Sequence, residues 1–95
     1  MQSVPLRGVQ FHGIWFVDEC VAGQRLELER EPTNGVDRNA IKVLHEGRHL
    51  GYLGREDAAM LAPRLDAGEH FEVELVAIWA LYERTNGLVN LYHHN

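Results

Sequence analysis

The stretch "REPTNGVDRNAIKV", from Arg30 to Val43, places a long polar connection between two segments that have strand-like sequences. Before it, residues 25–30 alternate polar and apolar side chains, which is typical of a strand with one buried face. After it, residues 40–44 resume an apolar pattern that favours a second strand. A two-residue hairpin turn would need a far shorter connection. We therefore expect two strands joined by an elaborate turn, and this turn is the first place to look for a binding site.

The segment that follows this turn contains the clearest hairpin in the chain. Glu46-Gly47-Arg48 is a tight-turn signal, and residues 49–53 return as an antiparallel strand. From residue 55 to about 66 the spacing changes to that of a helix, whose apolar face carries Ala58, Leu61, Ala62 and Leu65. We expect Pro63 to break or kink this helix and Gly68 to close the segment.

Strand-like sequence also fills both ends of the chain. Residues 4–16 are β-rich, and the glycines at positions 8 and 13 suggest bulges or close backbone approach. Residues 70–82 alternate at first and then become apolar on both faces, as expected of a strand that enters the core. Thr85-Asn86-Gly87 predicts a turn before a final strand at 88–92. The sum is a mainly β fold, with about six strands and one helical insertion in a small closed or partly open barrel.

Length and charge limit the classes of protein that fit. The 95 residues are 45% hydrophobic, which suits a single domain over residues 1–95 with one modest core. The net charge is -5, and the nine basic residues are eight arginines and one lysine. This acidic balance argues against broad, charge-driven binding to nucleic acid. A small arginine-lined site remains compatible with it, because arginine makes bidentate contacts with phosphate.

The cysteine content and the absence of targeting signals point to a soluble, cytoplasmic domain without a membrane partner. Cys20 is the only cysteine, so neither an internal disulfide nor a zinc site with paired cysteines can form. The first residues lack the basic and apolar regions of a secretion signal, and no apolar run approaches membrane-spanning length.

Residue types that could support catalysis or metal binding are present, but their patterns are more typical of loops and solvated surfaces. "DECVAG" around Cys20 resembles a turn with no oxyanion loop beside it, and no nucleophile-elbow, P-loop or zinc-protease motif occurs. His45 and His49 flank the hairpin turn, and His93-His94 lies near the end of the chain. We interpret both pairs as solvated histidines, since a zinc site needs three or four ligands. We expect no catalytic residue, no metal and no cofactor.

The polar residues of the long turn divide into two groups. Asn34, Asp37 and Asn39 have short side chains that can bond to backbone amides and shape a turn. The basic residues Arg30, Arg38 and Lys42 are not explained in this way, because a turn needs no basic groups. An Asp37 carboxylate held ionised between Arg30 and Arg38 could accept a hydrogen bond from a ligand hydroxyl, or it could simply form an ion pair.

A family motif runs through the same region. The residues that carry it are Arg30-Glu31-Pro32, Asn34, Asp37, Asn39-Ala40-Ile41, Val43 and Gly51-Tyr52-Leu53. In this order and spacing they resemble the HIRAN domain, a family found in SWI/SNF-type helicases. The resemblance extends upstream, where Gly8 to Phe11 is similar to the family's first strand, so it covers most of the chain.

The resemblance implies both a fold and a ligand. The fold would be a six-stranded barrel related to the OB-fold, with a short helical insertion at about residues 55–66. The ligand would be single-stranded DNA or DNA 3′ ends, bound in a repair or processing context. By position, Phe11 would stack on a base, Asp37 would bond the terminal hydroxyl, Arg55 would contact a phosphate, and Tyr52 would border the groove.

Two further positions belong to the same expected nucleic-acid site, together with Arg30 and Arg38. Gln10 stands where a DNA-end-binding member has an arginine, and Val36 stands where that member has an aromatic ring. The alternative function is a protein-interaction module for a separately encoded helicase or nuclease. Such a module would use an exposed barrel edge or an apolar surface, or it would form a dimer through Trp15 or Trp79.

Overall fold

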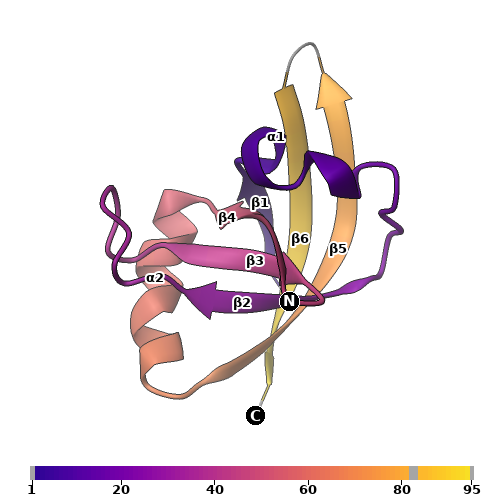
Figure 1. The fold of residues 1–95 in the computed structure, drawn as a ribbon. Helices are drawn as coiled ribbons and strands as arrows, with labels where there is room; N and C mark the ends of the chain where they lie inside the picture. Colours follow the sequence, from indigo (N-terminus) through magenta and orange to yellow (C-terminus); the bar gives the residue numbers. More distant parts are fainter. Residues whose placement is uncertain (1, 82–83, 95) are drawn as a thin grey trace.

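The computed structural model describes residues 2–81 and 84–94, which form a closed antiparallel barrel (Figure 1). The strands are β1 (Gln2–Arg7), β2 (Arg25–Arg30), β3 (Ile41–His45), β4 (Arg48–Leu53), β5 (His70–Leu81) and β6 (Arg84–His94). Their order around the barrel is β1-β4-β3-β2-β5-β6, and β1 pairs with β6 to close it. The prediction of a mainly β, six-stranded barrel with one helical insertion is confirmed.

The core forms because apolar residues recur at alternate positions of the strands and point into the barrel. The strand side chains that are buried most completely are Val4, Leu6, Ile41, Val43, Leu50, Val73, Leu75 and Val89. Each such side chain contributes about 1.5–3 kcal/mol when it is removed from water. The barrel interior is therefore the main source of stability, and it supports the surface features described below.

The helix α2 (Arg55–Asp66) lies between β4 and β5 and confirms the predicted insertion. Its buried residues Ala58, Leu61 and Ala62 pack into the same core cluster as the strands. Pro63 does not break the helix, which continues to Asp66. Pro63 lies in the last turn of the helix, and the hydrogen bond that it removes is the one to the carbonyl of Ala59. Because Ala59 is exposed, water can satisfy that carbonyl. No helix among residues 2–81 and 84–94 is long and apolar enough to cross a membrane.

The predicted strand over residues 4–16 is wrong beyond Arg7. The chain turns at Gly8, whose φ is 76°, and forms a short helix α1 (Val9–His12) and the 3-10 helix η1 (Ile14–Phe16). Val9 and Phe16 are fully buried, so these helices are anchored in the core. A Cβ atom at position 13 would collide with the carbonyl of Leu50, which explains the second glycine by close backbone approach.

The C-terminal hairpin also differs from its prediction. Leu75 lies in the core and Ile78 packs against it, as predicted, but the strand then leaves the core. Trp79 is 44% exposed, and Figure 1 shows β5 and β6 extending together beyond the barrel. Asn86-Gly87 lies inside β6 and is not a turn, since Gly87 pairs with both Ile78 and Leu6. A Cβ at Gly87 would lie 2.9 Å from the Leu6 Cβ, so close packing requires glycine here. Tyr82, at the end of the strand predicted over residues 70–82, is outside the described residues.

Candidate functional site

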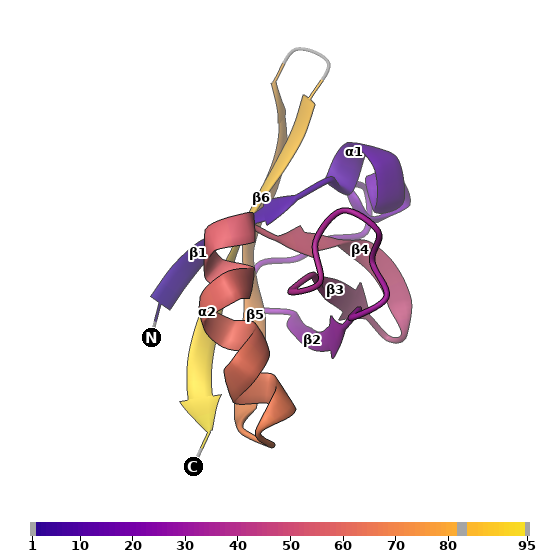
Figure 2. The same cartoon turned by 90° about the vertical axis from the view of Figure 1, so that its left-hand side faces the viewer.

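A groove of about 1010 Å³ lies where β1, α1, the turn at residues 31–40, β4 and the first turn of α2 meet. Figure 2 shows the turn and α1 on one side and the start of α2 on the other. The lining residues are Pro5, Arg7, Gly8, Phe11, His12, Asn34, Val36, Asp37, Ala40, Tyr52, Leu53, Gly54, Arg55, Glu56 and Asp57. Of the predicted site residues, Phe11, Val36, Asp37, Tyr52 and Arg55 are therefore brought together.

Side chains within the turn hold its backbone. The Asn34 Oδ1 accepts hydrogen bonds from the backbone N–H groups of Val36 (2.9 Å) and Asp37 (3.0 Å). The Asp37 Oδ1 accepts one from the backbone N–H of Asn39 at 2.9 Å. Short polar side chains that bond to nearby amides are the usual means of fixing such a turn. Asn34 and Asp37 therefore shape the turn as the sequence predicts.

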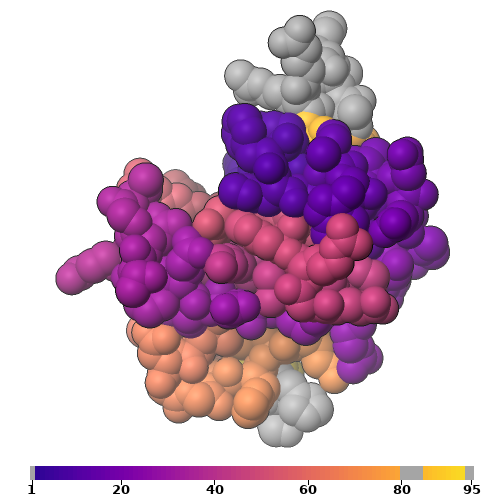
Figure 3. Space-filling view, viewed as in Figure 1, coloured from indigo at the N-terminus to yellow at the C-terminus, as the bar shows by residue number. Residues whose placement is uncertain are grey.

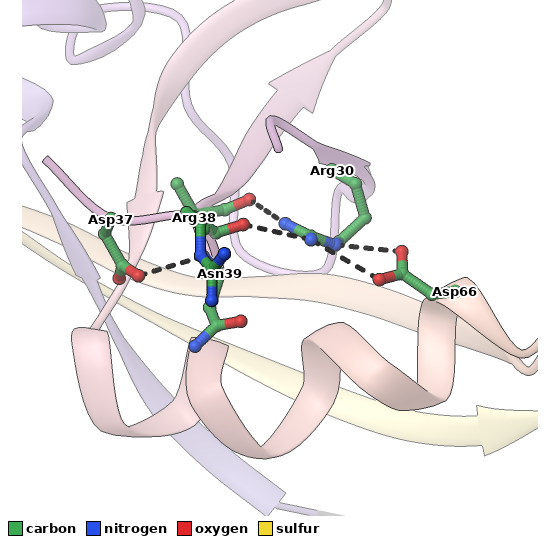
Figure 4. A network of polar contacts seen from close by, with 6 residues as sticks. Arg30, Asp37, Arg38, Asn39 and Asp66 are labelled. Carbon is green, nitrogen blue, oxygen red and sulfur yellow. Dashed lines mark hydrogen bonds and ion pairs between the residues drawn. The ribbon is translucent and has the colours of Figure 1, made fainter. Parts of the chain in front are cut away.

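Arg30 also belongs to the turn, although the sequence predicts a ligand contact for it. Its guanidinium donates to the backbone carbonyls of Ala40 (2.8 Å) and Arg38 (3.0 Å) and pairs with Asp66 at 3.0 Å. Figure 4 shows Arg30 on one side of the turn and Asp37 on the other. The premise that a turn needs no basic group is thus corrected. Neither Arg30 nor the exposed Arg38 lines the groove.

The cation that faces Asp37 is Arg55, at the first residue of α2. The Arg55 Nε lies 3.8 Å from the Asp37 Oδ2, and the Arg55 guanidinium also donates to the carbonyl of Val36 at 3.1 Å. The Asp37 side chain is 21% exposed and that of Arg55 is 73% exposed. This arrangement leaves a carboxylate oxygen beside an accessible cation, and such a pair can receive a hydroxyl and a phosphate of one ligand.

Glu31 fixes the other side of the groove. Its carboxylate accepts hydrogen bonds from Asn34 (2.6 Å) and Tyr52 (2.9 Å) and pairs with Lys42 at 3.0 Å. The hydrogen bonds from Asn34, Lys42 and Tyr52 lower the pKa of Glu31 to about 2. Burial, and then the bond to Glu31, raises the pKa of the Tyr52 hydroxyl. Lys42 is therefore committed to Glu31, and Tyr52 is held in one orientation.

Aromatic and imidazole rings continue the surface from Tyr52 towards α1. The rings of His12 and His49 stack with centroids 4.4 Å apart, and both meet Tyr52 edge-on, at 5.4 and 4.8 Å. Burial, followed by the neighbouring His12, lowers the pKa of His49. Phe11 stands beside this cluster with 78% of its surface exposed. An exposed ring next to stacked rings is a suitable platform for a planar ligand.

Sequence reasoning missed Arg7 and His12, and it missed His12 because it treated residues 4–16 as one strand. The turn at Gly8 brings His12 to the groove, and that glycine was the available signal. Arg7 reaches the groove from the end of β1, where it pairs with Tyr52 of β4. Gln10 does not line the main groove. It lies in an adjoining hollow of about 420 Å³, which shares Arg7, Gly8 and Phe11 with the groove.

The residues considered for metal or thiol chemistry have other contacts. His45 packs on Phe16 with ring centroids 4.8 Å apart, and the Cys20 thiol donates to the carbonyl of Val17 at 3.2 Å. His93 lies 3.0 Å from Glu69. Within residues 2–81 and 84–94, no three histidine, cysteine or acidic side chains are grouped closely enough to hold a metal ion.

The closed six-stranded antiparallel barrel with one helical insertion defines an OB-like barrel class. The HIRAN domain family model matches residues 1–80, and the chain therefore belongs to the HIRAN domain family.

Solved structures agree with this fold. The crystal structure of the HIRAN domain of human HLTF superposes with a TM-score of 0.80 at 22% identity, covering 97% of this chain and 73% of that one. A crystal structure of a Lactobacillus plantarum protein gives a TM-score of 0.72 at 23% identity, covering 98% of this chain and 94% of the other.

A curated relative also matches part of the chain. The Fanconi-associated nuclease 1 homolog of Oryza sativa subsp. japonica is 48% identical over 52 residues. The match covers 50% of this chain and 5% of that relative's length.

Proposed function

We propose that this domain binds nucleic acid, and in particular single-stranded DNA at its 3′ ends, in DNA repair or processing. The observation that carries the proposal is the groove itself, which places Phe11, Asp37 and Arg55 around one space. A base can stack on Phe11, a terminal 3′-hydroxyl can donate to Asp37, and a phosphate can contact Arg55. Stacking contributes about 1–3 kcal/mol per base in such sites.

The comparisons support a setting in which nucleic acid is processed. One relative is named as a nuclease, and the similar segment is a small part of its length. The groove offers stacking, hydrogen-bonding and charged groups, so binding without catalysis is the function we propose for it.

The charges around the groove set the strength of binding. Arg7 and Arg55 line the groove, and the first turn of α2 presents backbone N–H groups that attract anions. Glu56 and Asp57 lie in the same turn and oppose further phosphate contacts. With Arg7 and Arg55 as the two phosphate contacts, the logarithm of the association constant for single-stranded DNA should fall linearly with the logarithm of the salt concentration, with a slope of about -1.4. We therefore expect short ligands and a modest salt dependence.

A fluorescence-anisotropy titration tests the end recognition. Oligonucleotides of one sequence, ending in a 3′-hydroxyl or a 3′-phosphate, are compared on the unchanged domain and on Asp37→Asn. The hydroxyl end should bind at least about tenfold more tightly, because the phosphate cannot donate to Asp37 and is repelled by it. Asp37→Asn should reduce this preference. Asp18→Asn is the matched control, because Asp18 is exposed and outside the groove. Equal, salt-insensitive binding of both ends would refute the proposal.

The alternative is a protein-interaction module for a helicase or nuclease, and one observation favours it. Trp79 on the projecting hairpin and Ile14 in η1 are 44% and 58% exposed. Trp15 is less available, because the Arg48 guanidinium covers its ring at 3.6 Å. A partner of this kind should stay bound after nuclease treatment and be lost in Trp79→Ser, whereas a DNA-bridged complex should be lost with nuclease alone.

A further inference from the structure

The seam between β2 and β5 ends before the strands do. The two strands pair at Arg25 with Glu74 and at Leu26 with Val73, and the register stops there. One step further, Glu27 would stand opposite Glu72. Like charges directly opposite each other destabilise a strand pair. This juxtaposition disfavours continued pairing, and the register ends here although β2 continues to Arg30 and β5 begins at His70.

A hollow of about 700 Å³ opens where this register ends. Leu28, Leu65 and Phe71 line it, and all three are partly buried hydrophobic residues packed against the core. Figure 3 shows this side of the molecule, with β2 to β4 across the middle and the start of β5 below them. The hollow is separate from the groove, since the two linings share no residue.

The strand β2 presents a backbone edge to this hollow, where Glu27 and Leu28 line it. Residues 27–30 of β2 pair with β3 on their other side, and residues 70–72 of β5 pair with β6. Within the described part of the chain, the β2–β5 register stops at Leu26, and residues 27–30 of β2 have no strand partner on the side that faces the seam. An open strand edge offers N–H and C=O groups to any extended chain that can reach it. The hollow thus combines an apolar floor with backbone groups suited to an added strand.

The rim of the hollow is acidic. Glu27, Glu46, Glu69 and Glu72 line it, against a single basic residue of the lining, Arg25. Arg25 lies 3.5 Å from Glu72, and Glu69 pairs with Arg64 at 2.8 Å. Glu27 has no ion pair among the described residues. Phosphate groups are disfavoured at such a rim, and lysine or arginine side chains are favoured.

We propose that this hollow binds an extended segment of a partner protein, in which lysine or arginine alternates with apolar residues. The apolar side chains would cover Leu28, Leu65 and Phe71, the basic ones would face Glu27 and Glu46, and the segment's backbone would pair with the open edge of β2. This is β-strand addition, in which backbone bonds supply affinity and alternate side chains supply specificity. The proposal does not depend on the groove or on nucleic-acid binding.

The test uses two defined peptides and no nucleic acid. Acetyl-(Lys-Val)3-amide is titrated into the isotope-labelled domain, and acetyl-(Glu-Val)3-amide serves as the charge-reversed probe. The expected result is a saturable change in the amide NMR signals of residues 27–30 and 69–72, for the basic peptide alone. Glu27→Lys should weaken this binding at least about threefold, the scale of losing an exposed ion pair.

Two controls keep the result decisive. Glu19→Lys makes the same charge change at an exposed position outside the hollow and should leave the affinity unchanged. A thermal melt of each variant confirms folding before affinities are compared. Signal changes outside the seam, equal binding of the acidic peptide, or an equal effect of Glu19→Lys would overturn the proposal. An oligonucleotide that shifts the same amides more strongly than the basic peptide would make the seam a nucleic-acid contact instead, and would also overturn it.

Discussion

The hydroxyl group of Tyr52 donates a 2.9 Å hydrogen bond to the Oε1 of Glu31, and so joins β4 to the first residue of the long turn. We expect Tyr52→Phe to lower the free energy of unfolding by about 1 kcal/mol, because one hydrogen bond is removed and the ring is kept. The pKa of Glu31 should rise from about 2, since that bond favours the ionised form. Chemical denaturation and an NMR pH titration measure the two effects. Tyr92→Phe is the control: it removes the similar 2.7 Å bond to Glu74 and should leave Glu31 unchanged.

The same carboxylate predicts how stability depends on pH. The folded pKa of Glu31 is about 2 and its ordinary value is 4.5, so the folded state favours the ionised form. This stabilisation is fully present above pH 4.5 and is lost as the pH falls from 4.5 towards 2. Glu31→Gln should remove that part of the slope, as measured by urea denaturation at successive pH values. An identical slope in Glu31→Gln and in the exposed control Glu19→Gln would show that other groups cause it.

Arg30 should act on stability and not on ligand affinity. Arg30→Lys keeps the charge but cannot donate to the carbonyls of both Ala40 and Arg38 while pairing with Asp66. We expect a loss of about 1–3 kcal/mol in the free energy of unfolding, because charge-assisted bonds to the turn are broken. Oligonucleotide affinity, measured where the variant is fully folded, should change less than about twofold. A larger loss of affinity, with stability unchanged, would assign Arg30 to the ligand.

Gly13 should be intolerant of a side chain. Gly13→Ala forces its Cβ into the carbonyl of Leu50, so α1 or β4 must shift. Overpacking of this kind costs about 1–3 kcal/mol, which a thermal melt will show as a lower midpoint. Gly35→Ala is the control, because a Cβ there meets no atom within 4 Å. Equal midpoints for the two variants would mean that the backbone contact is not tight.

Val36 is the position at which affinity should be gained. Its side chain is 83% exposed and lines the groove together with Phe11. We expect Val36→Tyr to tighten single-stranded DNA binding by about 5- to 150-fold, because one added stacking contact contributes about 1–3 kcal/mol. Val21→Tyr places the same ring at an exposed position outside the groove and should have no effect. Fluorescence anisotropy at constant salt measures the DNA affinity of both variants. Equal gains in affinity would indicate nonspecific stacking.

The parts of the fold that were predicted from sequence are those with a regular local period. Alternation at Arg25–Arg30, the Glu46-Gly47 turn and the helix from Arg55 each depend on neighbouring residues, and each is present. The Asn86-Gly87 prediction failed for a reason that lies elsewhere in the chain. Gly87 is required by the packing of Leu6, about eighty residues away in sequence, and no local pattern reports such a contact.

In the candidate site, too, the features set by neighbouring residues were predicted and those set by distant contacts were not. Asp37 was identified within the turn, because short polar residues bond to nearby backbone. Its neighbour Arg55 was found only through the family resemblance. The sequence placed the Asp37 carboxylate between Arg30 and Arg38, whereas the Arg30 guanidinium instead bonds to the carbonyls of Ala40 and Arg38. Which cation faces Asp37 depends on how α2 docks against the turn. His12 was missed because its position follows from the single backbone angle at Gly8.

Barrel closure has a consequence for chain connectivity. Gln2 of β1 is paired with Leu91 of β6, and paired residues of antiparallel strands lie about 5 Å apart. The polypeptide thus enters and leaves the barrel at adjacent points. A peptide segment attached before Gln2 and one attached after His94 would begin on the same side of the molecule. This domain could therefore be inserted into a longer protein without moving the flanking segments far apart.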